Sequence, residues 1–122
     1  MFVAVQRATA AALTEAREFP HEMSEVYRRR RDLVAEALGA IGLDVEPPQA
    51  TPYFWVAVPE GHTSESFAEL VLEQAAVVVA PGPAYGPSGE GFFRISLTVP
   101  DERLEQALRR IESSLRAGII EA

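Results

Sequence analysis

Arg94 stands out among the residues whose side chains could do chemistry. It lies in the stretch Phe92–Val99, which alternates as a strand does and directly follows a loop rich in glycine and proline. A strand holds its side chains rigidly, and a partly sheltered guanidinium can bind a carboxylate through two parallel hydrogen bonds. Ser96 and Thr98 share the same strand face, so the pattern also fits a plain polar face. The alternation alone leaves both interpretations open, a carboxylate clamp and an ordinary polar face.

The remaining bases and nucleophiles give weaker signals. His21 and His62 are the only histidines, and neither has the partner histidine that a zinc-protease motif requires. We expect surface or helix-capping roles for both, and no metal site. Ser88 stands in the segment Gly86–Gly89, which lacks the spacing of a nucleophile elbow. No catalytic nucleophile is therefore expected.

The composition excludes several kinds of chemistry. The chain has no cysteine, and all eleven basic residues are arginine, so it has no lysine either. The absence of cysteine excludes disulfides, thiol catalysis and thiolate metal sites. The absence of lysine excludes Schiff-base chemistry and a lysine general base within this chain. A reaction that needs a side-chain amine must therefore obtain it from outside this chain.

The charge balance argues against nucleic acid as a partner, and the lack of a long apolar run argues against a membrane span. Eighteen acidic residues against eleven basic ones give a formal net charge of −7, which repels phosphate backbones. Arg28–Arg31 are consecutive, so on a helix they point all round and form no single basic face. No apolar run approaches the roughly 20 residues that span a bilayer.

Glycines 82, 86, 89 and 91 invite comparison with a phosphate-binding loop. Such loops precede a helix, whose N-terminus then faces the anion. Here an alternating strand follows, and no Gly-Lys-Ser/Thr sequence is present. A nucleotide site is therefore not expected in this loop.

The periodicity of apolar residues predicts four helices and a small sheet around the loop. Helices are expected over residues 2–18 and over 20–41. A third is expected with Thr63 or Ser64 as its N-terminal cap, and a fourth from Pro100 to a stop at Gly118, with Arg116 near that end. Strands are expected over 51–58, 77–80 and 92–99, with a short additional one over 43–46, and 81–91 is an irregular loop. Both faces of the strand at 51–58 are apolar, so we expect cover on both sides. The strand at 77–80 is apolar throughout and is expected to be buried.

This order of elements predicts an α/β (α+β) sandwich, in which a small, mostly antiparallel sheet of three or four strands is covered by helices. The stripe over 20–41 makes a helix long for so small a domain, which is typical of a spine or connector. The helix over 2–18 has few large apolar residues, and it resembles the tail of a longer structure.

The stretch 79–97 resembles the C-terminal signature of fold-type I, class I/II aminotransferases, roughly V-x-P-G-x-x-F/Y-G-x-x-G-x-G-y-x-R-I-S. The matching residues are Val79, Pro81-Gly82, Tyr85-Gly86, Gly89, Gly91 and Arg94-Ile95-Ser96. Three further segments agree with the same family, namely Gln6 and Ala8 in the first helix, Tyr27–Leu33 in the long helix, and Tyr53–Val56 in the first strand. The amino-acid sequence of residues 85–98 is most similar to the LL-diaminopimelate and aspartate aminotransferase branch.

The resemblance implies a C-terminal small domain of a pyridoxal-phosphate-dependent aminotransferase. Residues 1–19 would belong to the large-domain side, and 20–122 would form the small domain with 20–41 as the long interdomain helix. In the family's pattern Arg94 binds the α-carboxylate of the amino-acid or 2-oxo-acid substrate, and Tyr85 and Gly86 lie in the active-site loop. The parent is then expected to be a cytoplasmic homodimer. The Schiff-base lysine has no counterpart here, so the isolated chain is expected to bind no cofactor and to be inactive.

A second hypothesis does not need the family. The chain could fold as a stand-alone α/β module that binds a small molecule or dimerises without catalysis, since small α/β sandwiches host many unrelated functions. Arg94 and the glycine- and proline-rich loop would then form an anion pocket.

Overall fold

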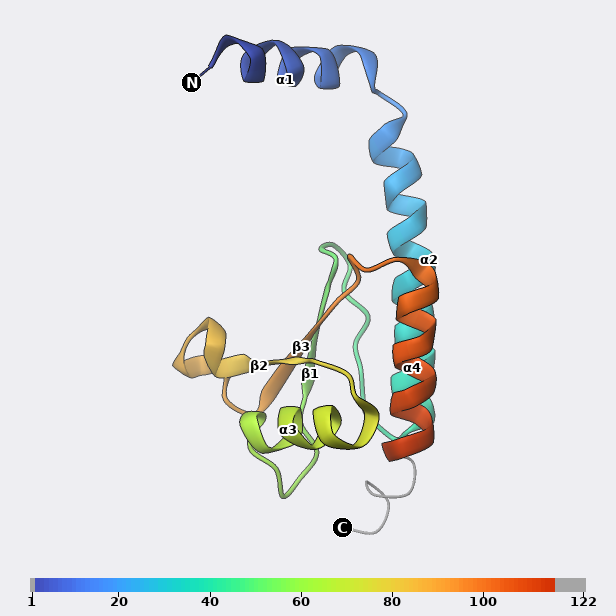
Figure 1. Ribbon diagram of the computed structural model, residues 1–122, viewed down its shortest axis with the longest axis vertical. Helices are drawn as coiled ribbons and strands as arrows, with labels where there is room; N and C mark the ends of the chain where they lie inside the picture. Colours follow the sequence, from blue (N-terminus) through green and yellow to red (C-terminus); the bar gives the residue numbers. More distant parts are fainter. Residues whose placement is uncertain (1, 116–122) are drawn as a thin grey trace.

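An antiparallel sheet in the order β1-β3-β2 forms the centre of the fold. The computed structural model describes residues 2–115 (Figure 1). Its elements are α1 (Val3–Glu15), α2 (Phe19–Ala40), β1 (Tyr53–Ala57), α3 (Ser64–Ala75), β2 (Ala80–Pro81), the 3₁₀ turns η1 (Gly82–Tyr85) and η2 (Pro87–Gly89), β3 (Phe92–Ser96) and α4 (Asp101–Leu115). The α/β fold with a small antiparallel sheet of three strands is therefore confirmed.

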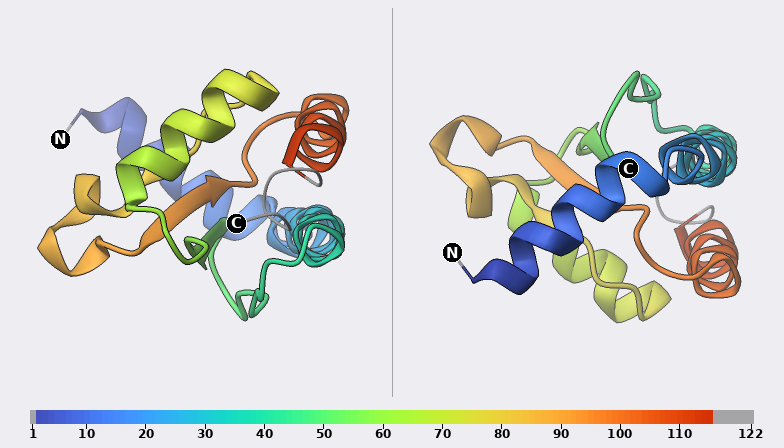
Figure 2. Two further views of the ribbon diagram at one scale, coloured as in Figure 1. Left: turned by 90° about the horizontal axis from the view of Figure 1, so that it is seen from below. Right: turned by 90° about the horizontal axis from the view of Figure 1, so that it is seen from above.

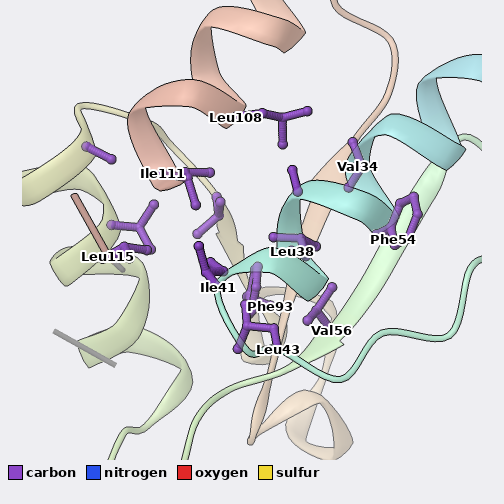
Figure 3. Close-up of a cluster of buried hydrophobic side chains, with 14 of the residues drawn as sticks. Val34, Leu38, Ile41, Leu43, Phe54, Val56, Phe93, Leu108, Ile111 and Leu115 are labelled. Atoms are coloured by element: carbon purple, nitrogen blue, oxygen red, sulfur yellow. The ribbon is translucent and has the colours of Figure 1, made fainter. Parts of the chain in front are cut away.

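Three helices pack against one face of this sheet. Figure 2 shows α2 and α4 side by side, with α3 lying along the sheet. The core joins apolar side chains from all three helices to the inward residues of β1 and β3 (Figure 3). The fully buried members with large side chains are Val34, Leu38, Ile41, Phe54, Val56, Phe67, Val71, Phe93, Leu97 and Leu115. Burial of this cluster out of water is the main term that stabilises the domain.

The other face of the sheet is open, which makes two predictions wrong. On β1 the inward Phe54 and Val56 are buried, but Tyr53 and Trp55 are 39% and 43% exposed, so the strand is covered on one side only. Of the predicted strand at 77–80 only Ala80 pairs with β3, and Val78 is 82% exposed although Val79 is buried. Apolar residues on both faces indicate cover, but the described residues supply it for one face.

The short strand predicted over 43–46 does not form. The backbone N–H of Leu43 donates to the carbonyl of Leu38 at 3.1 Å, so this segment finishes α2 instead of pairing with a strand. Gly42 has φ +85°, the left-handed conformation that favours glycine just after a helix. Leu43 is buried because it folds back onto the core, and Pro47-Pro48 then removes two backbone donors.

The helix boundaries differ modestly from those predicted. α1 ends at Glu15, earlier than the predicted residue 18, and α2 begins at Phe19 with Pro20 in its first turn. The predicted end of the last helix, at Arg116 and Gly118, lies outside the described residues.

α1 projects away from the sheet and the other helices (Figure 1). None of its residues is buried, and Phe2 beside it and Leu13 within it are 85% and 74% exposed. Within residues 2–115 no helix has both the length and the apolar character that a membrane crossing needs.

Candidate carboxylate-binding site

Arg94 lies at the centre of the open face of the sheet, between two tyrosine rings. Its guanidinium carbon is 4.3 Å from the ring centroid of Tyr53 on β1 and 4.3 Å from that of Tyr85 on η1. A guanidinium stacks well on aromatic faces, because its planar charge meets the negative π-cloud of each ring. Contact with two rings therefore restricts the orientation of the guanidinium before any ligand arrives.

The strand register builds this arrangement. Trp55 on β1 and Ala80 on β2 are both directly opposite Arg94, so the arginine is on the central strand with a neighbour on each side. The Trp55 ring lies edge-on to Tyr85 at 5.9 Å between centroids and stacks on Phe92 at 5.8 Å. These contacts form an aromatic cluster of Trp55, Tyr85 and Phe92 beside the guanidinium on the open face.

One nitrogen of Arg94 lacks a partner. Its Nε is buried, and no hydrogen-bond acceptor contacts it within residues 2–115. A buried donor without an acceptor is costly, so such groups in native proteins generally face a ligand or water. Nε and one terminal nitrogen of an arginine form the fork that a carboxylate binds with two parallel hydrogen bonds. The geometry therefore suits an incoming carboxylate.

The loop that carries Tyr85 closes through two glycines. A Cβ built on Gly82 would lie 1.9 Å from the carbonyl oxygen of Gly89, and a Cβ on Gly89 would lie 2.2 Å from the carbonyl oxygen of Gly82. Only glycine permits this backbone approach. Gly86 joins η1 to η2 with φ +124°. Tyr85 and Gly86 thus lie at the outer end of the loop, and Tyr85 alone of the two contacts Arg94.

Ser64 is a residue of this region that the sequence did not single out as functional. The sequence offered it only as an alternative to Thr63 for capping α3, and the structure gives the cap to Thr63, which forms a capping box with Ser66. Ser64 is instead completely buried and hydrogen-bonded to the end of the loop. Any polar side chain is tolerated at an exposed helix start. A serine directly after the capping residue therefore gives no sequence signal that it binds a distant loop.

The histidines and Ser88 do not join this site. His62 lies at the start of α3, edge-on to Phe67 at 5.8 Å between centroids, and His21 is exposed on α2. Ser88 is exposed on η2. No group of three or more potential metal-ligating side chains occurs among the described residues.

Three of the four consecutive arginines pair with different acidic residues, as expected for residues that point all round a helix. Arg28 pairs with Glu25 and Arg31 with Asp32. Arg30 is the most sheltered of these paired side chains, at 15% exposed, and its Nη1 donates to the carbonyl of Leu97 at 2.8 Å while its Nε pairs with Asp101. Arg30 therefore connects α2 to the start of α4.

Aminotransferases of this kind use pyridoxal phosphate, and this chain lacks the residue type to which that cofactor is covalently attached. The cofactor needs a lysine amine for covalent attachment, and the sequence contains none. The glycine-rich loop leads into β3 and not into a helix, so it offers no helix N-terminus to a phosphate. This chain therefore supplies neither the attachment lysine nor a glycine-rich loop that leads into a helix.

The sequence comparisons identify the family. The family described as "Aminotransferase class I and II" matches residues 2–111. LL-diaminopimelate aminotransferase of Moorella thermoacetica is 48% identical over 114 residues, which cover 93% of this chain and 29% of that enzyme. The enzyme of the same name from Oleidesulfovibrio alaskensis is 50% identical over 112 residues, covering 92% and 29%. The chain thus spans less than a third of the curated relatives it matches.

Solved structures give the same result. The aromatic aminotransferase from Pyrococcus horikoshii has a TM-score of 0.84 at 40% identity and covers 93% of this chain and 31% of its own. L,L-Diaminopimelate aminotransferase from Chlamydomonas reinhardtii has a TM-score of 0.85 at 29% identity, covering 94% and 28%. The predicted resemblance is confirmed by both kinds of comparison, and the chain belongs to the class I and II aminotransferase family.

Proposed function

We propose that this chain is the carboxylate-binding part of an aminotransferase that moves an amino group between an amino acid and a 2-oxo acid. Arg94 binds the α-carboxylate of either substrate through its guanidinium fork. The single observation that carries this role is the buried Nε of Arg94, which has no acceptor among the described residues and is held between two tyrosine rings.

In this proposal Arg94 contributes orientation, because a carboxylate held at two points keeps one position and one plane. Fewer orientations of the reacting bond then remain, which lowers the barrier through positioning. Tyr53 and Tyr85 keep the guanidinium plane fixed and exclude water from its two faces. The chain has no lysine, so the chemical step depends on residues beyond this chain's share of the enzyme.

The division of the chain belongs to the same proposal. Residues 1–19 lie on the large-domain side, and 20–122 form the small domain with the connecting helix at 20–41. The lack of buried residues in α1 supports this division, because a helix with apolar side chains and no buried residue lacks its packing partner. A homodimeric, cytoplasmic parent rests on family membership alone. The alternative of a stand-alone module gains nothing from the family match.

A ligand titration tests the carboxylate role directly on this chain. Trp55 is the only tryptophan, and it lies on the strand next to Arg94, so its fluorescence reports on the site. The ligands are LL-diaminopimelate, named by the relatives, then L-lysine, which keeps one α-carboxylate, and 1,5-diaminopentane, which has none. We expect saturable changes with the first two and none with the diamine. Arg94→Ala should abolish them, and equal binding by the variant would refute the assignment.

A further inference from the structure

The first turn of α3 is tied to the end of the loop by a complete set of hydrogen bonds. Ser64 is 0% exposed and is the one buried polar side chain among residues 2–115. Its Oγ accepts from the backbone N–H of Gly91 at 2.9 Å and of Phe92 at 3.1 Å, and donates to the carbonyl of Gly89 at 3.4 Å. A hydroxyl has one donor and two acceptor positions, so all three are used.

A carboxylate completes this connection from the loop side. Oε1 of Glu90 accepts from the backbone N–H of Ser64 at 3.0 Å. That N–H is in the first turn of α3, where helix donors lack partners inside the helix. A negative charge is also favourable there because of the helix dipole. Ser64 and Glu90 thus connect the helix and the loop in both directions.

The pairing of β2 with β3 joins the two ends of the loop at Pro81 and Phe93, but few other polar contacts fix the loop between them. The backbone bonds at Gly86, Gly89 and Glu90 all run to carbonyls within residues 82–90, so they shape the loop without attaching it. Beyond the bonds of Ser64, the amide of Val58 donates to the carbonyl of Gly91 at 2.9 Å. Tyr85 itself is 51% exposed and rests on the rings and guanidinium of the site. The position of Tyr85 over Arg94 therefore depends on where the loop is anchored.

We propose that Ser64 is a positioning residue for the carboxylate site. It holds residues 89–92 so that Tyr85 covers one face of the Arg94 guanidinium, and Glu90 supports it from the loop. This inference rests on the carboxylate role proposed above. Removing the hydroxyl leaves the part-buried amides of Gly91 and Phe92 without their acceptor, so this end of the loop must shift to satisfy them.

The test reads the loop position without any ligand. The proton on Nε of Arg94 lies beside two tyrosine rings, so its NMR resonance carries a ring-current shift that depends on Tyr85. Ser64→Ala removes the hydroxyl, and Ser64→Cys keeps a side chain of similar volume with much weaker hydrogen bonds. Ser66→Ala is the matched control, because Ser66 caps the same helix turn and its hydrogen bonds run to Thr63 and His62.

We expect the Nε–H resonance to move toward its unstacked position in both Ser64 variants and to stay unchanged in Ser66→Ala. The dissociation constant for L-lysine, read from Trp55, should rise roughly 10-fold in the Ser64 variants, as for the loss of one buried hydrogen bond. An unchanged Nε–H resonance in a folded Ser64→Cys chain would overturn the positioning role, whatever Ser64→Ala does.

The same data separate this inference from the proposed function. If the unmodified chain binds neither carboxylate ligand, the carboxylate role fails, and the resonance of Arg94 still decides whether Ser64 places Tyr85. If ligands bind and Arg94→Ala abolishes binding while both Ser64 variants keep full affinity and resonance, the positioning role alone fails.

Discussion

The backbones of Gly82 and Gly89 lie so close that neither residue has room for a Cβ atom. The carbonyl oxygen of each glycine lies within 2.2 Å of the position that a Cβ on the other would take. This contact brings the two ends of the loop together, and the loop then presents Tyr85 to Arg94. The two glycines are therefore required by packing, although neither has a positive φ.

Gly82→Ala should destabilise the domain by about 1–3 kcal/mol, because the obstacle is backbone that cannot rotate away. Urea unfolding monitored by circular dichroism measures the loss. Gly39→Ala is the matched control, since a Cβ there meets nothing within 4 Å. It should leave stability unchanged or raise it by about 0.5–1 kcal/mol, as alanine does inside a helix. Equal effects of the two substitutions would show that the close approach does not matter.

Arg30→Ala should cost about 1–3 kcal/mol, because the carbonyl of Leu97 and the carboxylate of Asp101 lose a sheltered, charged donor. Arg28→Ala is the control on the same helix. Its pair with Glu25 is exposed, with Arg28 at 59%, so its loss should change stability by less than about 0.5 kcal/mol. Thermal unfolding of both variants against the unmodified chain gives the comparison. Similar melting temperatures for the two would contradict the connecting role of Arg30.

The elements of the fold could be predicted where a local signal sets them. Thr63 was one of two expected caps, and its capping box starts α3. β3 forms in the stretch whose alternation predicted it, with Phe93 inward and Arg94 outward. These signals are local, because capping and period-two burial depend on residues close in sequence.

The contacts between distant segments could not be predicted. The exposure of Trp55 depends on what covers the sheet, and an apolar side chain looks the same in sequence whether or not its partner is present. Ser64 and Arg30 gave no signal because their partners lie 27 and 67 residues away. At the site, the sequence and the family resemblance selected Arg94, while the stacking between Tyr53 and Tyr85 became visible only in three dimensions.

The chain should associate with itself through α1. Phe2 and Leu13 are 85% and 74% exposed, and apolar patches of this kind promote association in water. Light scattering over a dilution series should give an apparent mass that falls as the chain is diluted. Leu13→Glu should weaken association, whereas Val78→Glu, at an equally exposed site away from α1, should not. A monomer at all concentrations would contradict this prediction.

The chain should form no stable covalent adduct with pyridoxal phosphate, because it has no lysine. Only the terminal amine could react. Borohydride reduction of the mixture followed by mass spectrometry checks this. A stoichiometric adduct at any site other than the terminal amine would contradict the prediction.

Arg94→Lys should weaken the full-length enzyme strongly, although it keeps the positive charge. Lysine lacks the planar fork that binds both carboxylate oxygens, and it cannot stack between Tyr53 and Tyr85 as a guanidinium does. The loss of a sheltered charged contact corresponds to a reduction of kcat/KM on the order of 10²–10³. Arg94→Ala should lower kcat/KM at least as much. The fold should survive, because the side chain lies on the open face of the sheet.

The substrate comparison distinguishes a carboxylate contact from general damage to the site. Steady-state kinetics of each variant are measured with an amino acid and with a plain amine that has no carboxylate. Arg94 can stabilise only the first, so the variants should lose activity toward the amino acid and keep the low activity of the unmodified enzyme toward the amine. Equal losses on both substrates, or no loss on either, would mean that Arg94 is not the carboxylate-binding residue.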